Sequence, residues 1–92
     1  MVDASHGNSS KQYANQRLVI DDIAAQVEAG ENRIFGVMIE SHLVAGNQSL
    51  KPGADLVYGQ SITDACVDWD TTIDLLDRLA AAVATRKRAA AA

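Results

Sequence analysis

The chain has 92 residues, which allow one small domain at most, and a hydrophobic fraction of 48%, which excludes a disordered chain. Eight basic against twelve acidic residues give a net charge of -4, and no basic stripe interleaved with aromatic residues precedes the C-terminal cluster 86–88, which argues against a nucleic-acid partner. No apolar stretch approaches the ~20 residues that span a bilayer, so we expect no membrane partner either.

The N-terminus is polar and lacks the hydrophobic segment of a signal peptide, and the chain has a single cysteine, Cys66. We therefore expect a cytoplasmic protein without an intramolecular disulfide. The cations Arg86, Lys87 and Arg88 fall where a last helix would end, and the helix dipole explains them more simply than a binding patch does. Residues 89–92 are all alanine and are expected to form a frayed tail.

The first 40 residues predict a strand, a helix and a second strand. Residues 1–5 would be the end of an extended segment that stops at His6. Over residues 9–30 the apolar side chains recur at spacings near three and four, which predicts an amphipathic helix capped by one of its first polar residues. Residues 33–40 are a compact apolar run, too short for a typical helix, and predict a buried strand that ends at Glu40. This order is typical of parallel sheets and predicts an α/β fold.

Residues 41–60 are expected to form a long irregular segment, with turn signals at residues 46–47 and 51–53. Within it, Leu50 and residues 56–58 would pair across the turn as a small hairpin. A loop of this length inside a compact domain is more often functional than idle.

A short extended piece over residues 60–65, ending at Asp64, is expected to follow the loop. Asp68 or Asp70 would then cap the last helix. The apolar stripe expected to face the core of that helix comprises Trp69, Ile73, Leu76, Leu79, Ala80 and Val83.

Three side chains of metal-ligating type stand at predicted strand ends. His6, Glu40 and Asp64 each fall where a strand gives way to its loop, and such ends lie on one face of a parallel array. One imidazole and two carboxylates suit a divalent first-row ion such as Mn, Fe, Co or Zn, bound as a Lewis acid with positions left open for substrate. The spacing alone leaves open that each residue is a cap, a loop hydrogen-bonder or a solvated side chain.

The remaining candidates have simpler explanations beside functional ones. His42 is expected either to support the ligands or contact a substrate, or to be an ordinary loop histidine. The run from Asn8 to Lys11 would hold an anion at a helix N-terminus, but capping explains it equally well. Cys66 is expected to be a small buried hydrophobe and Trp69 a core residue.

Three motifs resemble the C-terminal part of type I 3-deoxy-D-arabino-heptulosonate-7-phosphate (DAHP) synthase, the metal-dependent transferase that opens the shikimate pathway to chorismate and the aromatic amino acids. They are SHGNSSKQ at residues 5–12, GVMIESHLVAGNQSL at 36–50 and YGQSITDACVDW at 58–69. The family fold is a (β/α)8 TIM barrel. The resemblance implies that residues 1–92 are the C-terminal segment of that barrel domain, about its last quarter, and hence an incomplete barrel.

The resemblance also implies roles for the three strand-end residues. His6, Glu40 and Asp64 match the family's metal ligands, His6 would in addition be catalytic, and Asp64 would also touch substrate. The family's fourth ligand is a cysteine of an early strand, which has no counterpart here, and Cys66 matches a different cysteine that pairs with it in some relatives. The implied reaction condenses phosphoenolpyruvate and erythrose 4-phosphate with water to give DAHP and phosphate.

The parts that the family uses to hold both substrates and to form its oligomer have no counterpart in this chain. We therefore expect a homo-oligomeric parent and an isolated chain that is inactive. An alternative is a non-catalytic truncated module that folds only by assembling with itself or with a complementary barrel piece. A third is a self-sufficient small α/β metal-binding protein, which would need its short strands to form a stable sheet unaided.

Overall fold

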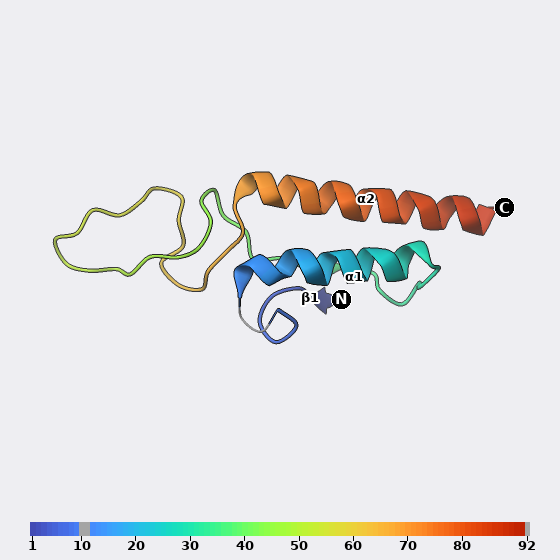
Figure 1. Cartoon of the computed structure of the whole chain (residues 1–92), viewed down its shortest axis with the longest axis horizontal. Helices are drawn as coiled ribbons and strands as arrows, with labels where there is room; N and C mark the ends of the chain where they lie inside the picture. Colours follow the sequence, from blue (N-terminus) through green and yellow to red (C-terminus); the bar gives the residue numbers. More distant parts are fainter. Residues whose placement is uncertain (10–11, 92) are drawn as a thin grey trace.

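The computed structural model describes residues 1–9 and 12–91 of the chain. Its elements in chain order are β1 (Val2–Asp3), the short 3-10 helix η1 (Tyr13–Asn15), α1 (Gln16–Glu28), β2 (Val37–Met38) and α2 (Trp69–Ala91). The molecule is elongated, with principal extents of 61 × 23 × 16 Å. Figure 1 shows α1 and α2 side by side and running in the same direction, while most of the chain between β2 and α2 extends beyond their N-terminal ends as a loop.

β1 and β2 form a two-stranded parallel sheet with α1 between them in sequence, as expected of a βαβ unit. Val2 lies opposite Val37, and Asp3 lies opposite Met38. The predicted α/β class and the strand–helix–strand order are confirmed. β2 is shorter than the apolar run 33–40, because only the part of that run that faces β1 pairs as a strand.

The strand predicted over residues 60–65 does not form in the described structure. Thr63 donates its backbone N–H to the Ser61 hydroxyl oxygen (3.1 Å), and such a local hydrogen bond competes with a sheet ladder. Within this segment Ser61 makes only an isolated parallel bridge with Asn47, and just after it Val67 makes another with Ser41. The chain therefore continues the sheet at this edge by single bridges.

The hairpin predicted between Leu50 and residues 56–58 is wrong. The Gln48 side chain donates from Nε2 to the Val57 carbonyl (2.8 Å), and its Oε1 accepts the Val57 N–H (2.8 Å). Both backbone groups that hairpin pairing would use at Val57 are thus taken by one side chain. Leu50 and Val57 remain exposed.

The core lies between the two helices and the sheet. Its buried members are Ala4, Ile20, Ile23, Ala24, Val27, Val67, Leu75 and Ala82. The four from α1 recur at helical spacing, as the apolar periodicity predicts. The start of this helix differs from the prediction, because α1 begins at Gln16 after η1 and neither helix has a side-chain cap. Capping by Asn8 or Ser9 is therefore wrong, and Ser10 lies outside the described residues.

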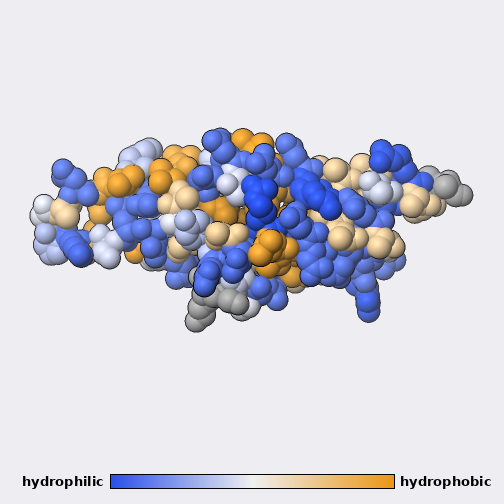
Figure 2. All heavy atoms as spheres, viewed as in Figure 1, coloured by the Kyte–Doolittle hydropathy of each residue, from blue (hydrophilic) through white to orange (hydrophobic). Residues whose placement is uncertain are grey.

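The apolar stripe predicted for the last helix is only partly buried. α2 packs on the core through Leu75 and Ala82, with Leu79 and Val83 beside them. The members of the stripe that stay exposed are Trp69, Ile73, Leu76 and Ala80. The prediction of Trp69 as a core residue is wrong, since its side chain is 51% exposed. Apolar residues surround more of α2 than α1 can cover, and Figure 2 shows hydrophobic residues reaching the surface along the molecule.

α2 begins as predicted behind Asp68, whose Oδ1 accepts the Thr71 N–H (2.8 Å). The helix continues through Ala91, so the tail expected to fray over 89–92 is helical as far as Ala91, and Ala92 lies outside the described residues. Within the described ranges, neither helix has the combination of length and apolar character needed to cross a bilayer.

The cap at Asp68 makes a testable prediction. Asp68→Ala should lower the thermal unfolding midpoint more than Asp70→Ala, because Asp68 accepts a first-turn N–H and Asp70 lies within the helix. The hydrogen bonds from Thr71 hold the pKa of Asp68 below its usual 3.8. The stabilisation should be complete above that value and be lost as the pH falls through the lower folded-state pKa. Circular dichroism melts across acid pH test this, and equal midpoints for the two variants would contradict it.

Candidate metal centre

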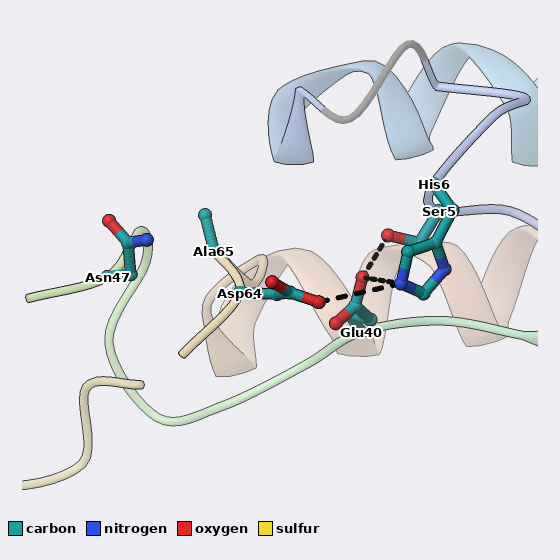
Figure 3. Close-up of a pocket in the computed structure, with 6 residues that line it drawn as sticks. All are labelled: Ser5, His6, Glu40, Asn47, Asp64 and Ala65. Carbon is teal, nitrogen blue, oxygen red and sulfur yellow. Dashed lines mark hydrogen bonds and ion pairs between the residues drawn. The ribbon is translucent and has the colours of Figure 1, made fainter. Parts of the chain in front are cut away.

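Three side chains from distant parts of the chain meet at one end of the sheet. His6 lies in the turn after β1, Glu40 follows β2, and Asp64 belongs to the loop that leads to α2. Figure 3 shows the two carboxylates on the same side of the imidazole, with all three groups at the edge of a cavity. The structure thus brings together the three residues that strand-end position singled out.

The distances within this cluster fit a single metal ion. His6 Nε2 lies 3.5 Å from Glu40 Oε1 and 3.5 Å from Asp64 Oδ2. One ligand atom from each residue lies within 4.8 Å of the others. Ligand atoms about 2 Å from a first-row ion lie roughly 3 to 3.5 Å from one another, so small side-chain rotations would suffice. The donor set, one nitrogen and two carboxylate oxygens, suits Mn, Fe, Co or Zn.

The cluster is open on one side. The side chain of Glu40 is 20% exposed, that of His6 46% and that of Asp64 71%. The cavity in front of it is lined by Ser5, His6, Glu40, Asn47, Asp64 and Ala65. An ion held here would have protein on the Glu40 side and free coordination positions toward the cavity.

The imidazole of His6 is surrounded by negative charge. Its Nδ1 lies 2.9 Å from Asp3 Oδ2, on the side of the ring away from Glu40 and Asp64. The hydrogen bond to Asp3 and the nearby charge of Glu40 raise the pKa of His6 above its ordinary value, and the same hydrogen bond lowers the pKa of Asp3. Three carboxylates around one ring therefore favour a positive charge at this position, whether a proton or a metal ion supplies it.

Glu40 is held by a buried amide from α1. Gln16 is fully buried; its Nε2 donates to the Glu40 carbonyl (3.1 Å), and its Oε1 accepts the Glu40 N–H (2.8 Å). The Ser5 hydroxyl donates to Glu40 Oε1. The amide satisfies the backbone just where β2 has ended, so the carboxylate is positioned by the helix as well as by the sheet.

Sequence reasoning did not identify Asp3 or Gln16. The sequence around each of these two residues does contain a pattern that could have identified it. Asp3 precedes the strand-end histidine by three residues, and Gln16 is a polar residue at the helical spacing of the buried face that continues at Ile20. A buried amide on an apolar face needs polar partners, and the exposed backbone at a strand end can supply them.

The other candidates do not join the cluster. His42 is exposed, and its Nδ1 accepts the neighbouring Leu43 N–H (2.8 Å), as in an ordinary loop histidine. Cys66 is buried as expected, and burial raises the pKa of its thiol. Asn8 donates to the Asp3 carbonyl (2.7 Å), and the buried Ser9 donates its hydroxyl to the His6 carbonyl (3.3 Å). The other two residues of the expected anion cradle, Ser10 and Lys11, lie outside the described residues.

Fold and site together define a class: an α/β protein with a histidine–carboxylate cluster at the carboxyl ends of parallel strands. The model of the DAHP synthetase I family matches residues 1–77. The chain therefore belongs to the DAHP synthetase I family.

Relatives from bacteria and fungi agree with this assignment. The chain is 55% identical over 87 residues to the Phe-sensitive phospho-2-dehydro-3-deoxyheptonate aldolase of Escherichia coli K12, covering 95% of this chain and 25% of that protein. It is 50% identical over 91 residues to the tyrosine-inhibited enzyme of the same name from Candida albicans, covering 95% and 25%. The solved structure of the aldolase from Francisella tularensis matches with a TM-score of 0.83 and 53% identity, over 91% of this chain and 24% of that one.

The chain spans about a quarter of the length of the curated relatives it matches. The matched quarter includes the whole cluster of His6, Glu40 and Asp64.

The two hydrogen bonds between the Gln16 amide and the Glu40 backbone can be tested with a matched pair of variants. Gln16→Leu should destabilise the fold by about 1 to 3 kcal/mol, because it removes hydrogen bonds from the backbone N–H and carbonyl of Glu40. Gln26→Leu on the exposed side of the same helix should change little, since its amide contacts only the exposed Asp22 in the described structure. Urea unfolding measures both. A similar loss in the free energy of unfolding for the two variants would show that the Gln16 hydrogen bonds to Glu40 do not stabilise the fold.

Proposed function

We propose that this chain carries three protein ligands of the divalent metal site of a DAHP synthase, which condenses phosphoenolpyruvate with erythrose 4-phosphate. The observation that supports the proposal is the cluster of His6, Glu40 and Asp64 in a member of the DAHP synthetase I family. In this proposal the chain is the C-terminal part of a (β/α)8 barrel. The whole protein is homo-oligomeric in this proposal, as the sequence resemblance implies, and cytoplasmic, as expected from the polar N-terminus and the single cysteine.

Each ligand has a separate task in this proposal. Glu40, the least exposed of the three, anchors the ion against the sheet. His6 presents Nε2 to the same point and would lie near the reacting groups, while the exposed Asp64 borders the cavity where substrate would enter. A bound Mn, Fe, Co or Zn ion would supply Lewis acidity toward an oxygen of the aldehyde substrate.

The cavity beside the cluster is poorly suited to bind the phosphate groups of the two substrates. Both carry phosphate groups, which proteins bind through arginine, lysine or clustered backbone N–H groups. The six residues that line this cavity in the described structure are neutral or acidic apart from His6. Phosphate recognition therefore falls to other parts of the full-length protein, and the isolated chain should be inactive.

The exposed face of α2 favours a second candidate, in which the chain works only when assembled with a complementary piece of the barrel. Trp69, Ile73 and Leu76 are 51%, 41% and 50% exposed along one side of this helix. In a closed barrel neighbouring elements would cover this face of α2. Here the sheet has only two strands, and the face stays exposed to water. Copurified or added N-terminal barrel segments that restore turnover would support this candidate.

Metal binding can be tested with two aspartates of the same loop region. Asp64→Asn should weaken Mn²⁺ binding by more than about tenfold, because loss of even an outer partner of a ligand typically costs 10- to 100-fold. Asp55→Asn removes the same charge from an exposed position and should leave affinity unchanged. Isothermal titration of the two variants against the unaltered chain measures this. Equal affinities for both variants would overturn the proposed site.

Catalysis by the chain alone is a separate measurement. We expect no DAHP from the purified 92-residue chain supplied with Mn²⁺ and both substrates, since the described residues that line the cavity include no arginine or lysine to bind phosphate. Turnover by this chain alone would contradict that expectation.

A further inference from the structure

Asp3 occupies an unusual position relative to the candidate ligands. It is the last residue of β1, and its Oδ2 lies 2.9 Å from Nδ1 of His6. The opposite ring nitrogen, Nε2, is the one that faces Glu40 and Asp64 at 3.5 Å. Each nitrogen of the ring therefore has its own set of carboxylate partners, and Asp3 alone stands on the Nδ1 side among the contacts of the described residues.

The Asp3 carboxylate is itself held in place. Its Oδ1 accepts the backbone N–H of Ser5 (2.8 Å), and its backbone carbonyl accepts Nδ2 of Asn8 (2.7 Å). These bonds close a tight turn in which His6 has φ = 46°, a left-handed conformation that non-glycine residues seldom adopt. The turn and the carboxylate thus fix both the backbone and the ring of His6.

A neutral imidazole carries its single proton on one nitrogen and offers the other as a metal ligand. A carboxylate can only accept, and the Asp3 carboxylate lies 2.9 Å from Nδ1, whereas Glu40 and Asp64 lie 3.5 Å from Nε2. The shorter contact, at an ordinary hydrogen-bond distance, favours the proton on Nδ1. We infer that Asp3 is a positioning residue that holds His6 in the Nδ1–H tautomer, with the Nε2 lone pair directed at Glu40 and Asp64. The inference rests on the proposed metal site for its functional meaning, but the tautomer is a property of the metal-free chain.

The Asp3–His6 contact adds little to the stability of the fold. The two side chains are 43% and 46% exposed, and ion pairs at such exposure are largely offset by solvent and by lost side-chain freedom. Its effect should therefore be found in the orientation of the ring and in metal affinity, and not in the unfolding midpoint.

Asp3→Asn is the discriminating variant. The asparagine keeps an oxygen for the Ser5 N–H but presents an NH2 group where Oδ2 stood, and this group donates to Nδ1. His6 should then carry its proton on Nε2. Ring ¹⁵N shifts measured by long-range ¹H–¹⁵N correlation, well above the pKa of the imidazole, should report Nδ1–H in the unaltered chain and Nε2–H in the variant.

Metal affinity supplies the second readout. Asp3→Asn should weaken Mn²⁺ binding about 10- to 100-fold, as expected when the outer partner of a histidine ligand is lost. Asp22→Asn is the matched control, because it removes the same charge from an exposed position on α1. Its Mn²⁺ affinity and its His6 tautomer should equal those of the unaltered chain.

The outcomes separate this inference from the proposed function. An Nε2–H tautomer or a random mixture in the unaltered chain would overturn the role of Asp3 without any variant. If the unaltered chain binds Mn²⁺, equal Mn²⁺ affinities for Asp3→Asn and Asp22→Asn would overturn it as well. An unaltered chain that shows the Nδ1–H tautomer but binds no Mn²⁺ would uphold the positioning by Asp3 and defeat the metal site.

Discussion

The site depends on the parallel pairing of β1 with β2. The Ala4 N–H donates to the Met38 carbonyl (2.8 Å). This bond sets where the segments after β1 and β2 leave the sheet, so that His6 and Glu40 lie side by side. A slip of one residue in this register would turn alternate side chains to the opposite face and separate the imidazole from the carboxylate. A sheet of two short strands thus controls the geometry of the whole cluster, supported by the Gln16 amide that grips Glu40 from the helix layer.

The electrostatics of the cluster follow from that geometry. Asp3, Glu40 and Asp64 surround a single imidazole, and carboxylates gathered this closely repel one another unless a positive charge lies between them. In the metal-free chain a proton on His6 meets this need, which is why its pKa is raised. A divalent ion would meet it more fully and would bind where Nε2 faces the two carboxylates. The same negative field makes the cavity unsuited to hold a phosphate without further cations.

Local patterns predicted the parts of the fold that depend on neighbours in sequence. The apolar periodicity of α1, the Asp68 cap and the strand–helix–strand order are of this kind, and the shared position of His6, Glu40 and Asp64 at strand ends followed from the order. The errors came from competing long-range contacts. Gln48 takes the backbone bonds that a hairpin needs, and the choice between the two apolar sides of α2, which leaves Trp69 exposed, depends on what α1 covers.

The most direct test of the metal site is a two-dimensional amide NMR spectrum of the 92-residue chain, recorded before and after substoichiometric Mn²⁺. The ion broadens signals from nuclei near it, so each amide reports its own distance from the site. We expect dispersed peaks, with broadening confined to the neighbourhoods of His6, Glu40 and Asp64. Broadening spread over the exposed carboxylates of both helices, or a spectrum without dispersion, would contradict it.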